Sequence, residues 1–302
     1  MLNVIEHNFV HAIESDPDKS PALAAIEALF VVLTQSNAST VLGLTDELKQ
    51  AVAAMRNTDV STTAVQSASE LFMRFISLAA LDQPNFDECR RVLLARGQQF
   101  LVRVGNCRTK IVANTIPFIK NGARILTHSF SRVVCDCLLE AAARGRSFHV
   151  FVTESRPDSS GYRLRHKLAE RAVACTVVLD AAVAYVMESV DLVFVGAEGV
   201  VETGGIINKI GTCNIGLAAK AMNKPVYVLA ESVKFVKEYP LNQKDIPDTF
   251  KYSASARNSG RPLDDEHPLV DYTAPEYVTL LFTDLGILTP AAVSDELIKL
   301  YL

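Results

Sequence analysis

The chain lacks the features that mark several broad classes of protein. There is no excess of basic residues, since 30 Lys and Arg stand against 34 Asp and Glu, for a net charge of -4. This balance provides no basic field for nucleic acid, so direct nucleic-acid binding is not expected. No apolar run approaches the roughly 18 residues of a membrane-spanning helix, so no membrane partner is expected either.

Cysteine spacing excludes the usual zinc patterns. The six cysteines form no Cys-x-x-Cys, and the nearest pair, Cys135 and Cys137, falls within a predicted helix, where side chains two positions apart point away from each other. No metal site is therefore expected, and the cysteines are interpreted as reduced thiols of the core. The N-terminal residues include Glu6, Glu14 and Asp16 and no apolar signal core, so a soluble protein of the cytosol is expected.

Loop motifs that would identify an enzyme class are missing as well. No G-x-G-x-x-G follows the first predicted strand and no G-x-x-x-x-G-K-[ST] occurs, so neither a dinucleotide cofactor nor P-loop GTP hydrolysis is expected. Ser129 follows a strand, but the surrounding Thr-His-Ser-Phe-Ser is not the G-x-S-x-G elbow of a nucleophile. His128 is a poor candidate base for Ser129, because adjacent side chains on an extended segment point to opposite faces.

Residues 1–118 show helical patterns and no strand signal. The predicted helices are Ala22–Leu33, Thr45–Met55, Ala64–Leu81 and Asp87–Val104. The first of them follows Ser20-Pro21, an N-cap with proline at the first helical position. The sequence therefore predicts an α-helical domain at 1–118.

Residues 119–302 follow a different pattern, in which short apolar runs alternate with helical stretches. The predicted strands are Arg124–Thr127, Phe148–Val152, Thr176–Leu179, Leu192–Val195 and Val226–Leu229, and the predicted helices lie near 131–144, 161–172, 181–189 and 214–222. Strands and helices that alternate in this way are typical of a parallel, doubly wound sheet. We therefore expect an α/β domain at 119–302, with the polar segment 253–268 as a mobile surface loop.

A glycine-rich stretch, Val195–Thr212, follows one of these strands and carries Glu198, Asn208 and Lys209. Glycines let backbone N–H groups turn toward an anion, and a lysine adds a cation. Because parallel strands end at the same edge of a sheet, this stretch should meet the polar residues that follow the other strands. Those residues include Ser129, Arg156, Asp180, Glu231 and Lys234. The pattern indicates an anion pocket; the alternative is a set of ordinary capping residues and surface ion pairs.

Several longer segments occur in a recognisable order along the chain. They are Leu71–Leu78, Ile125–Ser129, Thr153–Pro157, Val195–Thr212, Leu280–Pro290 and Val293–Leu302. Together they resemble the family that contains the alpha, beta and delta subunits of eukaryotic translation initiation factor 2B and the archaeal and bacterial sugar-phosphate isomerases. The resemblance covers nearly the whole chain, and the two C-terminal segments are similar to the alpha subunits in particular.

This resemblance implies a helical N-terminal domain and a Rossmann-like C-terminal domain that mediates dimerisation. It also implies a regulatory subunit of the complex that exchanges guanine nucleotide on initiation factor 2, in which another subunit carries the exchange activity. The implied partners are a second copy of the chain, the beta, delta, gamma and epsilon subunits, and the phosphorylated alpha subunit of initiation factor 2. Family regions associated with sensing that phosphorylation contain Thr40, Ser69 and Arg74 here, although Arg74 has the alternative of pairing with Glu70.

The isomerase members use a cysteine in a Leu-Thr-His-Cys context and an aspartate in a Val-Gly-Ala-Asp context for proton transfer. Ser129 and Glu198 occupy these positions here. A serine hydroxyl is far less acidic than a thiol, whose pKa is about 8.5, and the added methylene of Glu198 displaces its carboxylate by roughly 1 Å, which can cost about 10²-fold in rate. We therefore expect no catalytic residue and no cofactor.

The binding groups of the pocket, in contrast, are kept. A sugar phosphate or nucleoside monophosphate is the expected ligand, and the residues expected to hold it are Ser129, Arg156, Glu198, Asn208, Lys209 and Lys234. Two alternatives remain open, an active sugar-phosphate isomerase and a nucleotide-dependent metabolic enzyme.

Apolar and aromatic residues accumulate near the C-terminus, and a domain of this size is not expected to bury all of them. Part of this surface is expected to form a two-fold interface with a second copy. The alternative is a last helix packed on the sheet. The residues are Tyr277, Leu280, Leu281, Phe282, Leu285, Leu297, Leu300 and Tyr301.

Overall fold

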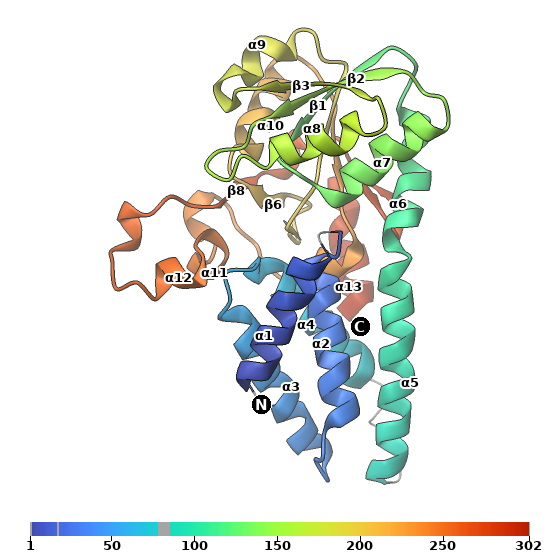
Figure 1. Ribbon diagram of the computed structural model, residues 1–302, viewed down its shortest axis with the longest axis vertical. Helices are drawn as coiled ribbons and strands as arrows, with labels where there is room; N and C mark the ends of the chain where they lie inside the picture. Colours follow the sequence, from blue (N-terminus) through green and yellow to red (C-terminus); the bar gives the residue numbers. More distant parts are fainter. Residues whose placement is uncertain (1, 17, 78–84, 302) are drawn as a thin grey trace. The chain divides into compact units, whose positions relative to one another are not determined.

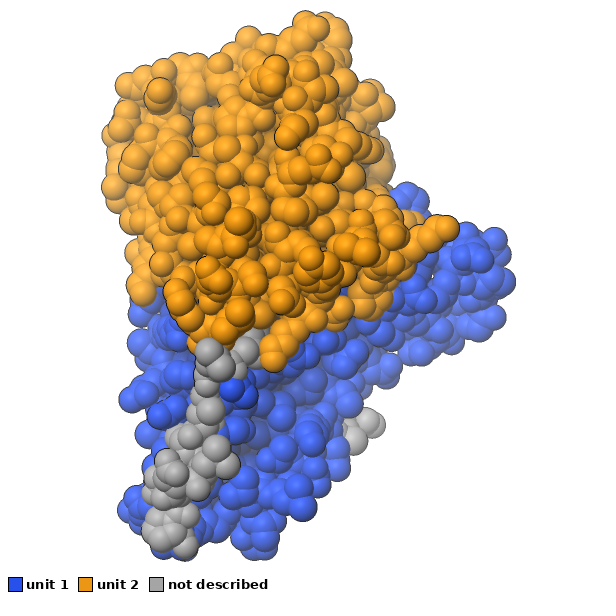
Figure 2. Space-filling model, turned by 180° about the vertical axis from the view of Figure 1, so that it is seen from behind, with its two compact units in different colours: residues 1–106, 248–267, 300–302 blue, residues 107–247, 268–299 orange. Residues whose placement is uncertain are grey.

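The computed structural model describes residues 2–16, 18–77 and 85–301, and their contacts divide the chain into two units. The first unit comprises residues 1–106, 248–267 and 300–302, and the second comprises 107–247 and 268–299 (Figure 2). These bounds differ from the expected division after residue 118. The difference arises because the helix α6 (Cys107–Thr115) packs on a helix and a strand of the second unit.

The first unit is built from helices (Figure 1). They are α1 (Leu2–Ser15), α2 (Pro21–Gln35), α3 (Val41–Arg56), α4 (Thr62–Ser77) and α5 (Phe86–Gly105). The predicted helices are confirmed, except that the end of Ala64–Leu81 beyond Ser77 lies outside the described residues. The predicted start of α2 is also confirmed, because the Ser20 hydroxyl accepts a hydrogen bond from the Leu23 N–H and Pro21 opens the helix.

The core of the first unit surrounds α2, which contacts α1, α3, α4 and α5. Ala25, Ile26 and Leu29 of α2 are fully buried, as expected for a helix that is apolar on most of its faces. Close packing against α5 needs a small residue at Gly97, since a Cβ there would lie 2.7 Å from the Phe30 ring. The helical pattern of the sequence thus corresponds to one packed bundle.

Residues 253–268 lie largely at the surface, as predicted, but they are not only a loop. The segment 248–267 belongs to the first unit and contains α11 (Asp248–Lys251), α12 (Ala254–Arg257) and a 3-10 turn at Leu263–Asp265. Hydrogen bonds attach it to the turn after α3, where the Ser255 N–H donates to Asp59 Oδ1 at 2.7 Å and Asn258 Nδ2 donates to Asn57 Oδ1 at 3.2 Å. The polar composition gave no sign of these contacts, because they join residues that are far apart in the sequence, 196 positions in the case of Ser255 and Asp59.

The second unit is organised around a seven-stranded sheet of order β10-β9-β7-β4-β1-β2-β3. The strands are β1 (Ala123–His128), β2 (Phe148–Thr153), β3 (Ala174–Val178), β4 (Leu192–Val195), β7 (Val226–Leu229), β9 (Leu280–Thr283) and β10 (Gly286–Leu288). All neighbours pair in parallel except β9 and β10, which are antiparallel. The predicted doubly wound α/β fold is confirmed, and β4 and β7 have the predicted bounds.

Helices connect these strands (Figure 1). They are α7 (Arg132–Ala143), α8 (Gly161–Ala169), α9 (Val183–Met187) and α10 (Thr212–Ala221), and a further helix, α13 (Val293–Tyr301), follows the last strand. 3-10 turns lie at 116–118, 180–182, 232–234, 243–245, 275–277 and 290–292. The helix predicted near 181–189 is shorter than expected, because its first turn is a 3-10 turn.

A second, small sheet occupies what the sequence suggested was a glycine-rich loop. It consists of β5 (Gly199–Val200), β6 (Ile206–Lys209) and β8 (Val270–Thr273), paired antiparallel in that order. Loop geometry was therefore the wrong expectation for Val195–Thr212, most of which is a hairpin that pairs with a distant strand. The sheet places Asn208 and Lys209 at the end of β6, directly before the turn into α10.

The C-terminal apolar residues divide between the core and the surface. Leu281 and Phe282 are fully buried in β9, and Leu297 of α13 is 4% exposed, so these three do not form an external interface of this unit. The expectation was wrong for Leu281 and Phe282 because β9 was not predicted as a strand, whereas Leu297 belongs to the last helix α13, which was the alternative. Ile287 and Ile298, which were not among the predicted residues, are 43% and 48% exposed.

The six cysteines are free thiols, four of them buried. Burial raises the pKa of Cys137 to about 12, with a smaller opposing effect from the hydrogen bond with Thr115, so this thiol stays protonated. Across the described ranges, no cluster of His, Cys, Asp or Glu is arranged to hold a metal ion. None of the helices within those ranges has the length and apolar character needed to cross a membrane.

Candidate functional site

The ends of β1 and β2 meet at the start of α8, at the carboxyl edge of the large sheet. Ser129, directly after β1, has a left-handed backbone with φ 62°, and Ser155, after β2, has φ 61°. The Ser129 hydroxyl lies 2.6 Å from the hydroxyl of Ser160, the residue before α8. Left-handed geometry at residues other than glycine is uncommon and concentrates at functional sites. This edge is therefore the first place to look for a site.

Asp180 fixes the loop that follows β2. Its two carboxylate oxygens accept hydrogen bonds from the N–H groups of Ser155, at 2.8 Å, and Arg156, at 2.7 Å. The Arg156 side chain itself is 64% exposed and pairs with Glu154, with 3.2 Å between Nε and Oε2. Arg156 therefore stands apart from the buried groups of this edge, and its guanidinium already has a carboxylate beside it.

Lys209, at the end of β6, pairs with Asp158 of the β2–α8 loop. The ammonium nitrogen lies 2.6 Å from Asp158 Oδ2, and Oδ1 accepts a hydrogen bond from the Ser160 N–H at 3.0 Å. Burial acts to raise the pKa of Asp158, but the hydrogen bond and the charge of Lys209 outweigh it and hold that pKa below its usual value. The pair joins the small sheet to the loop that carries Ser160.

His128 is buried and has partners for both ring nitrogens. Nδ1 faces the Thr153 hydroxyl, and Nε2 lies 2.8 Å from the Ile210 carbonyl oxygen. Since a carbonyl only accepts, Nε2 carries the proton and Nδ1 accepts from the hydroxyl. Burial lowers the pKa of His128, against the opposing effect of the Ile210 carbonyl, so the imidazole is neutral. Its tautomer leaves no nitrogen available to Ser129.

The turn after β6 is tied together by side chains. Asn208 Nδ2 donates to the Thr212 hydroxyl at 3.0 Å, and that hydroxyl donates to the Lys209 carbonyl at 2.6 Å. Gly211, with φ 104°, lies against the ring of His128, where a Cβ would be 3.1 Å from Cε1. Glycine is required here by both its backbone and its neighbour.

Lys234 belongs to a second group of charges, after β7. Its ammonium lies 3.0 Å from Glu231 Oε2 and donates to the Ala197 carbonyl at 2.9 Å. Arg108 approaches the other oxygen of Glu231 at 3.6 Å. Burial acts to raise the pKa of Glu231, but the nearby charges of Lys234 and Arg108 lower it overall. Lys234 thus holds the backbone directly before Glu198, one of the predicted ligand groups.

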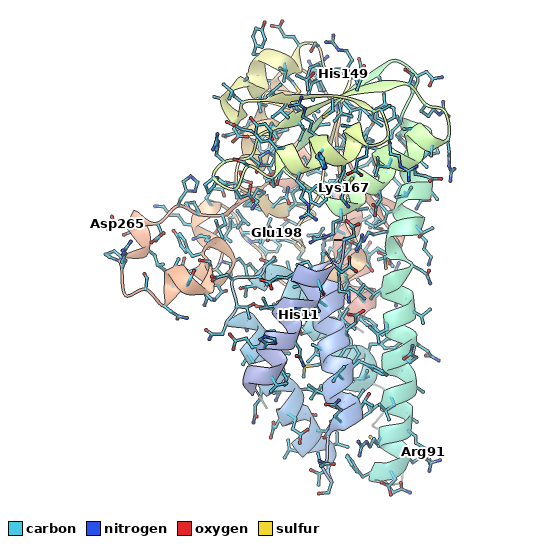
Figure 3. All side chains as sticks on the ribbon, viewed as in Figure 1. His11, Arg91, His149, Lys167, Glu198 and Asp265 are labelled. Atoms are coloured by element: carbon cyan, nitrogen blue, oxygen red, sulfur yellow. The ribbon has the colours of Figure 1, made fainter. Side chains whose placement is uncertain are left out.

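Glu198 (labelled in Figure 3) is half-buried between β4 and β5, where its N–H donates to the Ile207 carbonyl at 2.9 Å. Gly196 allows this segment to pass close to the start of α7, since a Cβ there would lie 2.5 Å from the Ser131 hydroxyl. The strand β4 therefore delivers Glu198 to the same edge as Ser129 and Lys209.

The structure thus brings together most of the predicted groups, in two sets. Ser129 and Lys209 are linked through Ser160 and Asp158, while Lys234 is linked to the backbone beside Glu198. Asn208 serves the turn, and Arg156 lies apart. Sequence reasoning missed Asp158 and Ser160, although a carboxylate and a hydroxyl between a strand and a helix were available as a signal.

Two buried hydroxyls at this edge lack a hydrogen-bond partner among the described residues. They belong to Thr127, the penultimate residue of β1, and to Ser155, which follows β2, and both side chains are fully buried. Buried polar groups are normally paired, so such atoms call for a bound water, ion or ligand. These are the atoms of this edge whose hydrogen bonds a water, an ion or a ligand would complete.

The residues predicted for partner binding lie on the first unit. Thr40 is exposed and caps α3, its hydroxyl accepting a hydrogen bond from the Gly43 N–H at 3.1 Å. Arg74 is half-buried in the last turn of α4. Ser69 is 1% exposed, so its hydroxyl does not reach the surface of this unit.

Comparison with known proteins adds relatives to this geometry. A profile described as "Initiation factor 2 subunit family" matches residues 14–290. The chain is 49% identical to translation initiation factor eIF2B subunit alpha of Caenorhabditis elegans over 98% of this chain and 97% of that protein. It is 28% identical to a ribose 1,5-bisphosphate isomerase of Archaeoglobus fulgidus over 81% of this chain and 77% of the isomerase.

A solved structure has the same fold. It is a chain of the tetrameric eIF2B-beta2-delta2 complex from C. thermophilum, which superposes with a TM-score of 0.77 over 100% of this chain and 96% of that one, at 21% identity.

Proposed function

The chain belongs to the initiation factor 2 subunit family, and on this premise we propose that it is the alpha subunit of the guanine nucleotide exchange factor for translation initiation factor 2. It acts there as a regulatory subunit without catalytic activity of its own. The identity of 49% over nearly the full length of an alpha subunit supports this proposal more strongly than any other observation. The 28% identity to an isomerase makes sugar-phosphate isomerisation the alternative to be tested.

The geometry around Ser129 argues against isomerisation. A serine needs a dedicated base for proton transfer, because its hydroxyl is a very weak acid. The nearest candidate, His128, uses both ring nitrogens for Thr153 and Ile210, and the Ser129 hydroxyl is occupied by Ser160. We therefore propose that Ser129, which the resemblance places at the position of the isomerase cysteine, binds a ligand and does not transfer protons.

The carboxyl edge of the large sheet is proposed to bind a sugar phosphate or a nucleoside monophosphate. Lys209 and Lys234 supply cations, and Glu198 and Asn208 supply groups that accept or donate to hydroxyls. The observation that carries this proposal is the pair of buried hydroxyls, Thr127 and Ser155, that have no partner among the described residues. Each cation already has a carboxylate beside it, so a phosphate must displace Asp158 or share Lys209 with it.

Thermal unfolding with ribose 5-phosphate, glucose 6-phosphate and AMP tests this pocket. A ligand that binds only the native state raises its stability by about 2.7 kcal/mol at 100 times Kd, so the midpoint should rise. Lys209→Ala should abolish the rise. Lys224→Ala is the matched control, because that lysine follows α10 and its ammonium donates to the Glu188 carbonyl at 3.4 Å, so this variant should leave the rise unchanged. No rise with any of the three compounds contradicts the pocket.

The proposed assembly is a homodimer that bridges the beta, delta, gamma and epsilon subunits and helps to sense phosphorylated initiation factor 2. Support comes from the family and from apolar side chains that stay exposed near the C-terminus, Ile287 and Ile298. Native mass measurement at micromolar concentration should give a dimer, and a well-folded monomer would contradict this part. Replacement of Thr40 or Arg74 should weaken binding of the phosphorylated partner; unchanged affinity would remove them from the sensing surface.

A further inference from the structure

Asp271 of β8 is a buried carboxylate to which the preceding sections give no role. It is 6% exposed, and its Oδ2 accepts two backbone hydrogen bonds, from Gly211 at 2.7 Å and from Cys213 at 3.1 Å. Both donors belong to the turn between β6 and the start of α10. A carboxylate at the start of a helix satisfies N–H groups that have no partner within the helix and also favours the helix dipole.

The turn that Asp271 holds is the one that presents the proposed ligand groups. Lys209 begins it, the Ile210 carbonyl fixes His128, and Thr212 ties the side chain of Asn208 to the Lys209 carbonyl. The two hydrogen bonds that Asp271 accepts come from the N–H groups of Gly211 and Cys213, which lie on either side of Thr212 in this turn. A shift of the turn would therefore move Lys209, Asn208 and the His128 contact together.

The second oxygen of Asp271 is also informative. Oδ1 is buried and makes no hydrogen bond to any residue of the described ranges. Titratable and charged groups on the elements packed against it are the Cys213 thiol and Lys220 of α10, Lys209 of β6 and, across Gly211, the His128 imidazole. Burial raises the pKa of Asp271 to about 7, and the hydrogen bonds from Cys213 and Gly211 oppose that shift only in part. Burial of this acid lowers the stability of the fold, and its two hydrogen bonds to the turn are the contacts that set against this loss.

We propose that Asp271 is the positioning residue of the ligand site: it holds the turn 209–213 from the neighbouring strand in the shape that places Lys209 and Asn208 toward the ligand. This inference rests on the proposed pocket. Asp271 itself touches no ligand in this arrangement, and its effect on binding passes through the backbone of the turn.

Two variants of Asp271 distinguish the effect of its hydrogen bonds to the turn from the effect of its negative charge. In Asp271→Asn, the amide oxygen still accepts from Gly211 and Cys213, so ligand binding should stay within about threefold of wild type. In Asp271→Ala the turn loses both hydrogen bonds, and the Kd for the sugar phosphate that stabilises the wild type should rise at least tenfold. Asp191→Ala is the matched control, because Asp191 accepts one backbone hydrogen bond, from Arg124 at 2.8 Å, at the amino edge of the seven-stranded sheet, away from the turn.

Hydrogen exchange of the amides of Gly211 and Cys213 provides a readout that does not depend on ligand. Exchange should be at least tenfold faster in Asp271→Ala and unchanged in Asp271→Asn and Asp191→Ala. Equal exchange in Asp271→Ala and wild type overturns the inference, and so does equal ligand affinity. If wild type binds none of the phosphorylated probes, the pocket fails, and the exchange rates alone then decide whether Asp271 holds the turn. If Asp271→Ala does not fold, Asp271→Ser takes its place in the same comparison.

Discussion

The two edges of the seven-stranded sheet are built from the same strands and differ in almost every other respect. At the amino edge, the reversals before β1 and β2 use glycine: Gly122 and Gly145 have φ 81° and 79°, and a Cβ on either would meet nothing within 4 Å. The reversals before β3 and β7 use left-handed residues other than glycine, Ala172 with φ 55° and Asn223 with φ 53°, and both are exposed. At the carboxyl edge, left-handed backbone is given to Ser129 and Ser155, which carry hydroxyls. The glycines there are crowded instead, and a Cβ at Gly161 would lie 2.0 Å from the Thr153 carbonyl oxygen.

The contrast teaches which constraints come from folding and which come from a site. A chain reversal needs only a permitted backbone, and glycine provides it without strain. Strained serines, buried carboxylates and unpaired hydroxyls all lower stability, so a sheet edge that collects them is organised for something besides folding. The carboxyl edge collects all three on buried residues, whereas the left-handed residues of the amino edge are exposed.

The largest effect is expected where a buried charge loses its partner. Lys234→Ala leaves Glu231, whose side chain is 6% exposed, with only the more distant Arg108. Removal of one member of a buried pair costs about 3 to 5 kcal/mol, so chemical denaturation should show a loss in this range. Arg144→Ala, at the end of α7, should cost less than about 1 kcal/mol, because both members of its pair with Glu140 are exposed. Adding Glu231→Gln to Lys234→Ala should recover much of the loss; no recovery would show that Lys234 acts through something other than this charge.

The next largest effect is expected when a glycine at each edge is replaced by alanine, which adds a methyl group. Gly161→Ala forces a Cβ against the backbone of β2 and should lower the free energy of unfolding by about 3 kcal/mol. Gly145→Ala meets open space and should cost only about 1 kcal/mol, for its left-handed backbone. Similar losses for the two variants would mean that the carboxyl edge is no more tightly packed than the amino edge.

The pH dependence of stability should reveal Asp271. Its native pKa is raised to about 7, so the native state holds a proton that the unfolded state releases, and its contribution to stability, complete below the unfolded pKa, is lost as pH rises toward 7. Between pH 5 and 8 the free energy of unfolding of the wild type should fall by about 2 kcal/mol relative to that of Asp271→Asn. Parallel pH profiles of the two proteins would contradict the raised pKa of Asp271.

His128 changes stability in the opposite direction. Its native pKa is lowered, so its contribution is present above the unfolded pKa and is lost as pH falls.

The smallest effect is expected at Ser129, where two variants distinguish the strain of its backbone from the hydrogen bond of its hydroxyl. Ser129→Ala keeps the left-handed backbone and loses the hydrogen bond to Ser160, which should cost about 1 kcal/mol. Ser129→Gly loses the same bond but relaxes the backbone, so it should stay within about 0.5 kcal/mol of wild type. The difference between the two midpoints in denaturant measures the strain, and equal midpoints would show that there is none.

Much of the fold could be predicted from the sequence because its signals are local. Continuous apolar runs gave β4 and β7 their bounds, and Ser20-Pro21 gave the start of α2. β9 and β10 were missed because Leu281 and Phe282 resemble exposed interface residues when no partner strand is known. The segment 253–268 was misjudged because its polar residues bond to a turn that is distant in sequence.

The site was predictable only as a list of groups. Strand ends identified Ser129, Lys209 and Lys234, since parallel topology brings such ends to one edge. Their pairing was not predictable, because Asp158 reaches Lys209 across 51 positions and Asp271 reaches Gly211 across 60. No local pattern in β8 distinguishes Asp271 from any other acidic residue of the chain.

The central claim is that the carboxyl edge binds a phosphorylated small molecule without converting it. Titration of ribose 1,5-bisphosphate into the purified protein, followed by ³¹P NMR, reports binding and conversion together. We expect the phosphate resonances to broaden or shift with added protein and no ribulose 1,5-bisphosphate to form, even after prolonged incubation. Accumulation of the ketose would contradict the account by showing that Ser129 and Glu198 still support catalysis, and unperturbed resonances would contradict the binding site itself.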